Sequence, residues 1–296
     1  MKKILIFSFF FCFLTLSLFG QEFHFGIRGG LNFSNITGPL DTGVVESYKT
    51  NNGFHFGIEA LYSLNEFFSV GTELQYSQIG AKYQYKGPSY YLFYNDDYYL
   101  LKNDNVTYDL NISNSYINIP VNVLIRPIKK IEFKLGGYMG FLINPTATGT
   151  MQFGQKFNQK LKFNYYSDKK APTIYDSFGT IYIKTTNEDG KEEIRSTVQT
   201  ARAYNQYPAD DYKNDSFYKV FDAGVNLGIS YFINNSLLVG VNFNYGLIDI
   251  TNNKLDRNLR TLTDDGDLFF NNEDKLNYKS DFDRNVNLQV SLGFRF

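Results

Sequence analysis

The chain has 296 residues, with 29 basic and 30 acidic side chains and a net charge of −1, so it has no basic surplus for binding nucleic acid. It contains 29 Phe and 24 Tyr, and this aromatic content argues against intrinsic disorder. After the N-terminus no apolar run approaches the about 20 residues that a membrane-spanning helix needs, which excludes a multi-pass helical membrane protein. The single cysteine, Cys12, lies near the N-terminus, so the rest of the chain offers no disulfide or thiolate site.

Residues 1–20 have the pattern of a secretory signal. Two lysines precede the apolar run Ile4–Phe19, and Gly20–Gln21 is the expected cleavage position. A membrane anchor is the alternative, but the run is short for a bilayer core. A lipoprotein signal at Cys12 is a second alternative, and the three phenylalanines before it do not resemble one. The prediction is an exported domain over residues 21–296, in the outer membrane of a Gram-negative envelope.

Eight segments of the exported part alternate apolar and polar residues with a period of two, as half-buried strands do. They are residues 23–33, 53–64, 67–78, 116–126, 131–143, 221–231, 237–247 and 285–296. Each is long enough to cross a bilayer as a tilted strand. Short connections alternate with long ones at about 34–52, 79–114, 144–216 and 251–284, which is typical of outer-membrane barrels.

A soluble eight-stranded barrel, such as a lipocalin, would show the same alternation. Composition separates the two folds, because the polar set is rich in Gly, Asn, Ser and charges, whereas the apolar set of Phe, Ile, Val, Leu and Tyr suits lipid. The predicted fold is all-β, an eight-stranded antiparallel transmembrane β-barrel with short periplasmic turns and long extracellular loops. Phe294 and Phe296 on the last segment resemble the signal read by the outer-membrane assembly machinery. Outer-membrane lipid and that machinery are therefore expected partners.

Five stretches resemble the PorT-like outer-membrane β-barrel family: ELQYSQIGAK (73–82), YINIPVNVLI (116–125), GGYMGFLI (136–143), FDAGVNLGISY (221–231) and FNYGLIDI (243–250). The resemblance covers the predicted strands and leaves out the long loops, above all 144–216. It implies the barrel fold. It also implies, as an alternative function, an accessory role in an outer-membrane protein secretion system.

The inward charges of a small barrel must pair with one another or with water, because its interior is filled by side chains. Register counted from the connections puts Arg28 opposite Glu59 and Glu59 opposite Glu73, with Lys134 at a similar height. The predicted lumen network is Arg28, Glu59, Glu73 and Lys134. A proton or ion gate is the functional interpretation, and a buried ion network that plugs the barrel is the favoured one.

The two histidines, His24 and His55, are predicted to face inward at opposite ends of the barrel, so they cannot share a metal. No predicted loop contains a histidine, whereas barrel enzymes place one near the outer loops. A Ser–His arrangement around His55 stays open without support. We therefore expect no catalytic, cofactor-binding or metal-binding residues, and an envelope-lipid-modifying enzyme is the least favoured function.

The long loops carry three further patterns. The second holds an aromatic cluster that suits partner contact, and packing among the loops or strands rising above the membrane is its alternative. Its members are Tyr83, Tyr85, Tyr90, Tyr91, Phe93, Tyr94, Tyr98 and Tyr99. The third loop predicts a hairpin around residues 188–190. The fourth loop is acidic. Its carboxylates are interpreted as solvent-exposed groups rather than as a calcium-binding loop: Asp264, Asp265, Asp267, Glu273 and Asp274.

The leading functional prediction is a structural or binding protein of the outer membrane. Its extracellular loops would contact a partner, such as an extracellular or secretion-system protein, without catalysis.

Overall fold

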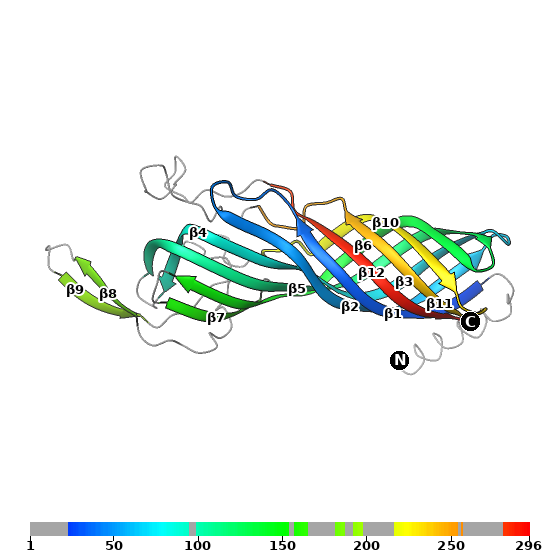
Figure 1. Ribbon diagram of the computed structural model, residues 1–296, viewed down its shortest axis with the longest axis horizontal. Helices are drawn as coiled ribbons and strands as arrows, with labels where there is room; N and C mark the ends of the chain where they lie inside the picture. The colour runs from blue at the N-terminus through cyan, green and yellow to red at the C-terminus, as the bar shows by residue number, and fades with distance from the viewer. Residues whose placement is uncertain are drawn as a thin grey trace, which may run out of the picture.

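The computed structural model describes residues 23–94, 99–153, 157–164, 181–186, 192–197, 216–253, 256 and 281–296. Eight antiparallel strands close into a ring, which confirms the predicted fold (Figure 1). In ring order they are β1 (Phe23–Thr37), β2 (Val45–Ser63), β3 (Phe68–Ile79), β5 (Tyr99–Ile128), β6 (Ile131–Phe153), β10 (Phe221–Phe232), β11 (Leu237–Gly246) and β12 (Arg284–Arg295). The predicted signal, residues 1–20, lies outside the described residues.

The alternation in sequence becomes an inside and an outside of the barrel. Outward apolar side chains such as Ile58 and Leu292, 60 % and 56 % exposed, form a continuous apolar surface that we call the lipid belt. Inward side chains such as Asn32 and Gln289 are polar and at most 2 % exposed. This arrangement suits a barrel whose outer wall contacts lipid.

No helix among the described residues is long and apolar enough to cross a membrane.

One end of the barrel has only short connections, at residues 64–67, 129–130 and 233–236, as predicted. Two of them are built in the same way. The side-chain oxygen of Asn65 accepts hydrogen bonds from the amides of Phe67 and Phe68, and Asn234 does the same for its own turn. Asn side chains readily accept such bonds from the backbone and so stabilise tight turns, which is why these connections can be short. We call this the short-turn end.

At the opposite end, part of the barrel wall rises past the belt (Figure 1). β4 (Ala81–Tyr94) follows β3 after Gly80 and pairs with both β2 and β5. β7 (Phe157–Asn164) pairs with β6. The name extension is used here for β4, β7 and the parts of β2, β5 and β6 that pair with them, residues 45–50, 99–111 and 146–153.

The extension corrects the predicted loop boundaries. Residues 34–37 and 45–52, and most of 79–114, are strand, and so are 144–153 and 157–164. Lipid-facing apolar residues marked the predicted strands, but a strand above the membrane faces water and carries no such mark. Most of the fourth predicted loop, 251–284, lies outside the described residues.

Side-chain polarity inverts between barrel and extension while the alternation itself continues. On β5 the inward residues are apolar first, at Val106, Tyr108, Leu110 and Ile112, and then polar, at Asn114 and Asn118. The outward residues change in the reverse order, from polar Asp109 and Asn111 to apolar Val121 and Val123. A β-bulge between Ser115 and Tyr116 in the β5–β6 pairing lies near this change. The inversion marks where lipid gives way to water.

The predicted hairpin around residues 188–190 is confirmed by β8 (Ile181–Thr186) and β9 (Glu192–Thr197), which pair antiparallel.

Candidate functional site: the plugged lumen

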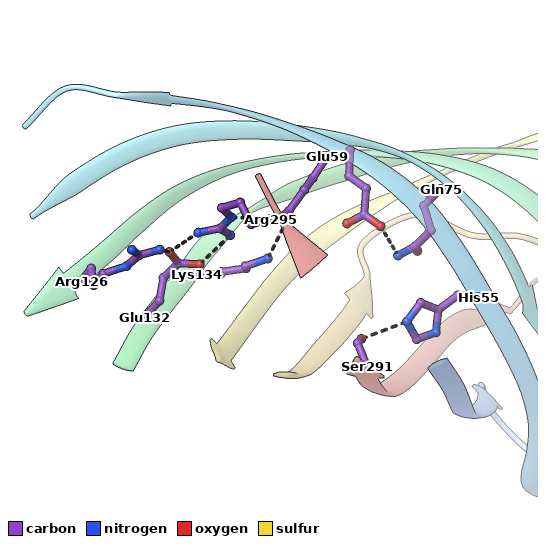
Figure 2. A network of polar contacts seen from close by, with 9 residues as sticks. His55, Glu59, Gln75, Arg126, Glu132, Lys134, Ser291 and Arg295 are labelled. Atoms are coloured by element: carbon purple, nitrogen blue, oxygen red, sulfur yellow. Dashed lines mark hydrogen bonds and ion pairs between the residues drawn. The ribbon is translucent and has the colours of Figure 1, made fainter. Parts of the chain in front are cut away.

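A chain of ion pairs crosses the lumen at the short-turn end, with Arg295 of β12 at its centre (Figure 2). The Nε of Arg295 donates to Glu59 at 2.9 Å, and its two terminal nitrogens donate to the carboxylate of Glu132 at 2.8 and 3.1 Å. Lys134 lies 3.6 Å from Glu59, and Arg126 lies 2.6 Å from Glu132. Because β2, β6 and β12 are not neighbours in the ring, these contacts tie separate walls of the barrel together.

Sequence reasoning found only part of this network. It placed Glu59 and Lys134 in one network, and these two do form an ion pair, but it left out Arg295 and Glu132. Both stand at inward positions of their strands, and that parity was visible in the sequence. The partner that each inward side chain reaches across the lumen depends on how the ring closes. The alternation of a single strand does not predict that partner.

Arg28 does not face Glu59, because the register of β1 and β2 differs by two residues from the predicted one. Gly26 lies opposite Glu59, and Arg28 lies opposite Gly57. The glycines explain this register: a Cβ on Gly26 would stand 2.8 Å from the Glu59 carboxylate, and one on Gly57 would collide with the Glu73 carboxylate. The missing side chains therefore make room for the two glutamates.

Glu59 and Glu73 are direct cross-strand partners, as predicted from the short connection between β2 and β3. Glu73 accepts a hydrogen bond from Gln75 at 3.1 Å, and Gln289 of β12 donates to Gln75 across the lumen at 3.1 Å. Glu73 has no ion pair among the described residues. The amides of Gln75 and Gln289 therefore link it to the opposite wall.

Arg28 is 4 % exposed, and its Nε and one terminal nitrogen have no hydrogen-bond partner among the described residues. It lines a small lumen cavity of about 30 Å³ together with Glu73, Lys134 and several Asn and Gln side chains. That volume holds one or two water molecules. A buried guanidinium needs such partners, and the side chains that fill an eight-stranded barrel leave little room for solutes.

His55 lies in a Ser–His–Asn chain. Its Nε2 lies 2.9 Å from the Ser291 hydroxyl and its Nδ1 lies 2.8 Å from the Asn32 side-chain oxygen (Figure 2 shows the Ser291 contact). If the ring carries its proton on Nδ1, Ser291 donates to Nε2, which is the hydrogen-bond order of a catalytic triad. All three side chains are at most 2 % exposed, so no substrate reaches the hydroxyl. This arrangement positions β1, β2 and β12 against one another.

Two of the predicted partner-binding aromatics, Tyr83 and Tyr85, are buried at 8 % and 1 % exposure, so they are unsuited to partner contact. They belong to an apolar core with Val106, Tyr108 and Leu110, and this core extends beyond the extension to Ile36 of β1 and to Ile250. Tyr83 donates to Glu46 at 2.9 Å, and burial raises the pKa of its phenol well above the ordinary value.

The remaining predicted aromatics are not placed by their side chains. Tyr90, Tyr91, Phe93, Tyr94 and Tyr99 lie in β4 and β5 by backbone, and their side chains are outside the described part of the chain, as is Tyr98.

The residues of the predicted assembly signal lie where the ring closes. Phe294 and Phe296 point outward, 46 % and 67 % exposed, and Phe296 exchanges two backbone hydrogen bonds with Phe25. Their role in assembly stays a prediction.

One group of acidic residues in the described chain could hold a metal ion. Carboxylate oxygens of Asp256, Asp281 and Asp283 lie within 4.8 Å of one another. Asp283 already accepts a hydrogen bond from Thr251 at 3.0 Å. The predicted acidic residues Asp264, Asp265, Asp267, Glu273 and Asp274 lie outside the described residues.

A closed eight-stranded barrel with a lipid-facing wall and a lumen filled by ion pairs and amides defines a class, the plugged barrels of the outer membrane. The family model described as "Outer membrane protein beta-barrel domain" matches residues 19–252. The chain therefore belongs to this family and is an outer-membrane protein.

Several solved structures are similar to the chain. Ail, the attachment invasion locus protein of Yersinia pestis, is 11 % identical with a TM-score of 0.34, and the match covers 93 % of this chain and 100 % of that one. Neisserial surface protein A is 10 % identical with a TM-score of 0.36, covering 92 % and 97 %. The outer membrane protease OmpT of Escherichia coli is 9 % identical with a TM-score of 0.29, covering 93 % and 96 %. These TM-scores are too low to indicate function. None of the curated proteins matches the chain.

Proposed function

We propose that this protein is a non-catalytic binding protein, anchored by its barrel, whose extension contacts a protein partner outside the cell. One observation carries the proposal: the strands β2, β5 and β6 continue past the lipid belt and form, with β4, a sheet that packs on an apolar core. A membrane anchor alone needs no such sheet. The plugged lumen argues against a diffusion pore, and the burial of Ser291 and His55 argues against hydrolysis.

The finer assignment to PorT-like proteins, and with it an accessory role in secretion, rests on the resemblance of the strands alone. The extension surface suits a protein of a secretion complex as well as any other partner, so the test below applies to both.

The test removes the far part of the extension and leaves the barrel intact. Gly87 pairs with Val106, so residues 88–105 can be replaced by Asn-Gly, which closes a two-residue hairpin at this pair. A photo-crosslinking residue at Lys86 on living cells should give a discrete protein adduct in the full-length chain. The truncated chain should lose that adduct and still show the heat-modifiable gel mobility of a folded barrel.

A crosslinker at Leu74, which is 58 % exposed in the lipid belt, serves as the matched control and should yield no such protein adduct. If position 86 gives no protein adduct in the full-length chain, or the same adduct after truncation, the proposal is wrong.

A further inference from the structure

The base of the extension carries a groove on its outward face that the barrel and its lumen do not use. Its volume is about 530 Å³. Two cationic and several uncharged polar residues line it, with one carboxylate: Lys49, Lys82, Gln84, Asp109, Asn111 and Thr148. The groove crosses β2, β4, β5 and β6, so the sheet itself holds the side chains in place.

Lys49 and Lys82 lie directly opposite each other on β2 and β4. Like charges at directly paired positions destabilise a sheet. Neither lysine has an ion pair among the described residues, although Lys49 donates a hydrogen bond to Gln84. An anion between the two ammonium groups would turn this repulsion into attraction.

The groove also continues the face that contacts lipid. On the continuous path of β3 and β4, outward residues pass from Leu74 and Tyr76 in the belt, through Gln78, to Lys82 in the groove. From Tyr76 to Lys82 is about 20 Å along a strand, or about 15 Å in height at the tilt of barrel strands. A molecule whose acyl chains lie on the belt would therefore bring its headgroup up to the groove.

The height of Lys82 above the belt indicates which kind of lipid headgroup could reach it. The headgroup layer of a phospholipid bilayer adds only about 5–8 Å to each side of the hydrocarbon core. A phosphate at about 15 Å needs a taller, saccharide headgroup. The residues between belt and lysines suit sugars, because Asn52, Gln78, Ser113 and Thr146 offer amides and hydroxyls on this face.

We propose that the groove at Lys49 and Lys82 binds a phosphorylated saccharide headgroup of an outer-leaflet glycolipid, whose acyl chains lie on the lipid belt below. The two lysines hold the phosphate, and Gln84, Asn111 and Thr148 contact the sugar. This site is at the base of the extension, whereas the test of partner binding removes residues 88–105, beyond Gly87. The truncated chain described above keeps it, so the two proposals fail separately.

The experiment measures glycolipid binding by native mass spectrometry of the folded protein released from detergent micelles. The probe is a rough lipopolysaccharide with a phosphorylated core. The same lipid after removal of its phosphate esters with hydrofluoric acid, and its deacylated water-soluble form, are the comparison ligands. We expect both comparison ligands to bind wild-type protein at least tenfold more weakly, since one lacks the anion and the other lacks the chains.

The double variant Lys49→Gln/Lys82→Gln should lose at least tenfold in affinity for the phosphorylated lipid, and Lys49→Arg/Lys82→Arg should keep most of it. Lys86→Gln is the matched control, because Lys86 is also exposed and outward on β4 and does not line the groove. It should change the affinity less than twofold.

Equal binding of the phosphorylated and dephosphorylated lipids to wild-type protein would overturn the proposal, whatever the variants do. Equal binding of the deacylated form would replace the membrane lipid by a soluble saccharide. An affinity loss in Lys86→Gln as large as in the double variant would reduce the site to general surface charge.

Discussion

The barrel and its extension are built from the same strands, and yet they bury opposite kinds of side chain. In the barrel, β5 turns Asn114 and Asn118 toward the lumen. Just before them in the sequence, it turns Leu110 and Ile112 into the apolar core. In lipid the outside is the apolar solvent, so polar groups turn inward and must satisfy one another. In water the usual hydrophobic core returns. The comparison teaches that the surrounding solvent decides the interior of each region.

The largest expected effect comes from the centre of the lumen network. Arg295→Met leaves the buried Glu59 and Glu132 without their main partner, and breaking a buried pair costs about 3–5 kcal/mol. Urea unfolding in liposomes measures the loss. Arg126→Met removes a cation whose side chain is 33 % exposed and should cost far less.

Adding Glu59→Gln and Glu132→Gln to Arg295→Met should recover part of that stability, because the two carboxylates that Arg295 neutralised are then uncharged. The recovery is incomplete, because Lys134 loses its ion pair with Glu59. A triple variant less stable than Arg295→Met alone would show that repulsion between the carboxylates is not the cause.

A new charge should lower the free energy of unfolding more in the lipid belt than on the outward face of the extension. Leu74→Lys places an ammonium group on the lipid face and should cost about 2–4 kcal/mol if it lies near the membrane midplane. Gln152→Lys makes the same side chain at an exposed outward position of β6 in the extension, opposite Thr107, and should change the free energy of unfolding by less than about 0.5 kcal/mol. Equal costs in the urea assay would contradict the assigned boundary between lipid and water.

The core of the extension should respond to the loss of one methylene group. Ile112→Val removes it from a side chain 4 % exposed and should cost about 0.5–1.5 kcal/mol. We expect this loss locally, as faster hydrogen exchange of the amides of β4 and of its partner residues in β5. Unchanged exchange there, with a lower urea midpoint for the whole barrel, would show that extension and barrel unfold as one unit.

Among the lumen residues, the smallest effect is expected at Arg28. Among the described residues its Nε and a terminal nitrogen have no hydrogen-bond partner and its side chain has no ion pair, so Arg28→Met should change stability by less than about 1 kcal/mol. The urea assay that measures Arg295→Met provides the comparison. A loss as large as for Arg295→Met would place Arg28 in the network after all.

The sequence determined the barrel by itself. Eight period-two segments, three short connections and a lipid-suited apolar set specify strand number, strand order and which residues face inward. The pairing of Glu59 with Glu73 was also predictable, because a short turn leaves almost no freedom in register. The extension was partly visible too, since Tyr83 and Tyr85 alternate with Lys82, Gln84 and Lys86, but that alternation has the opposite polarity from the one used to find the strands.

Only the tertiary structure decided which inward residues meet. Across a long connection such as the one between β1 and β2, counting from the loop gives the register only within a few residues, and the room beside Gly26 and Gly57 settles it. Arg295 and Glu132 are far apart in sequence and are not on neighbouring strands, so their contact exists only once the ring has closed. The physical reason is that alternation is a property of one strand, whereas a lumen contact depends on the curvature of the whole barrel.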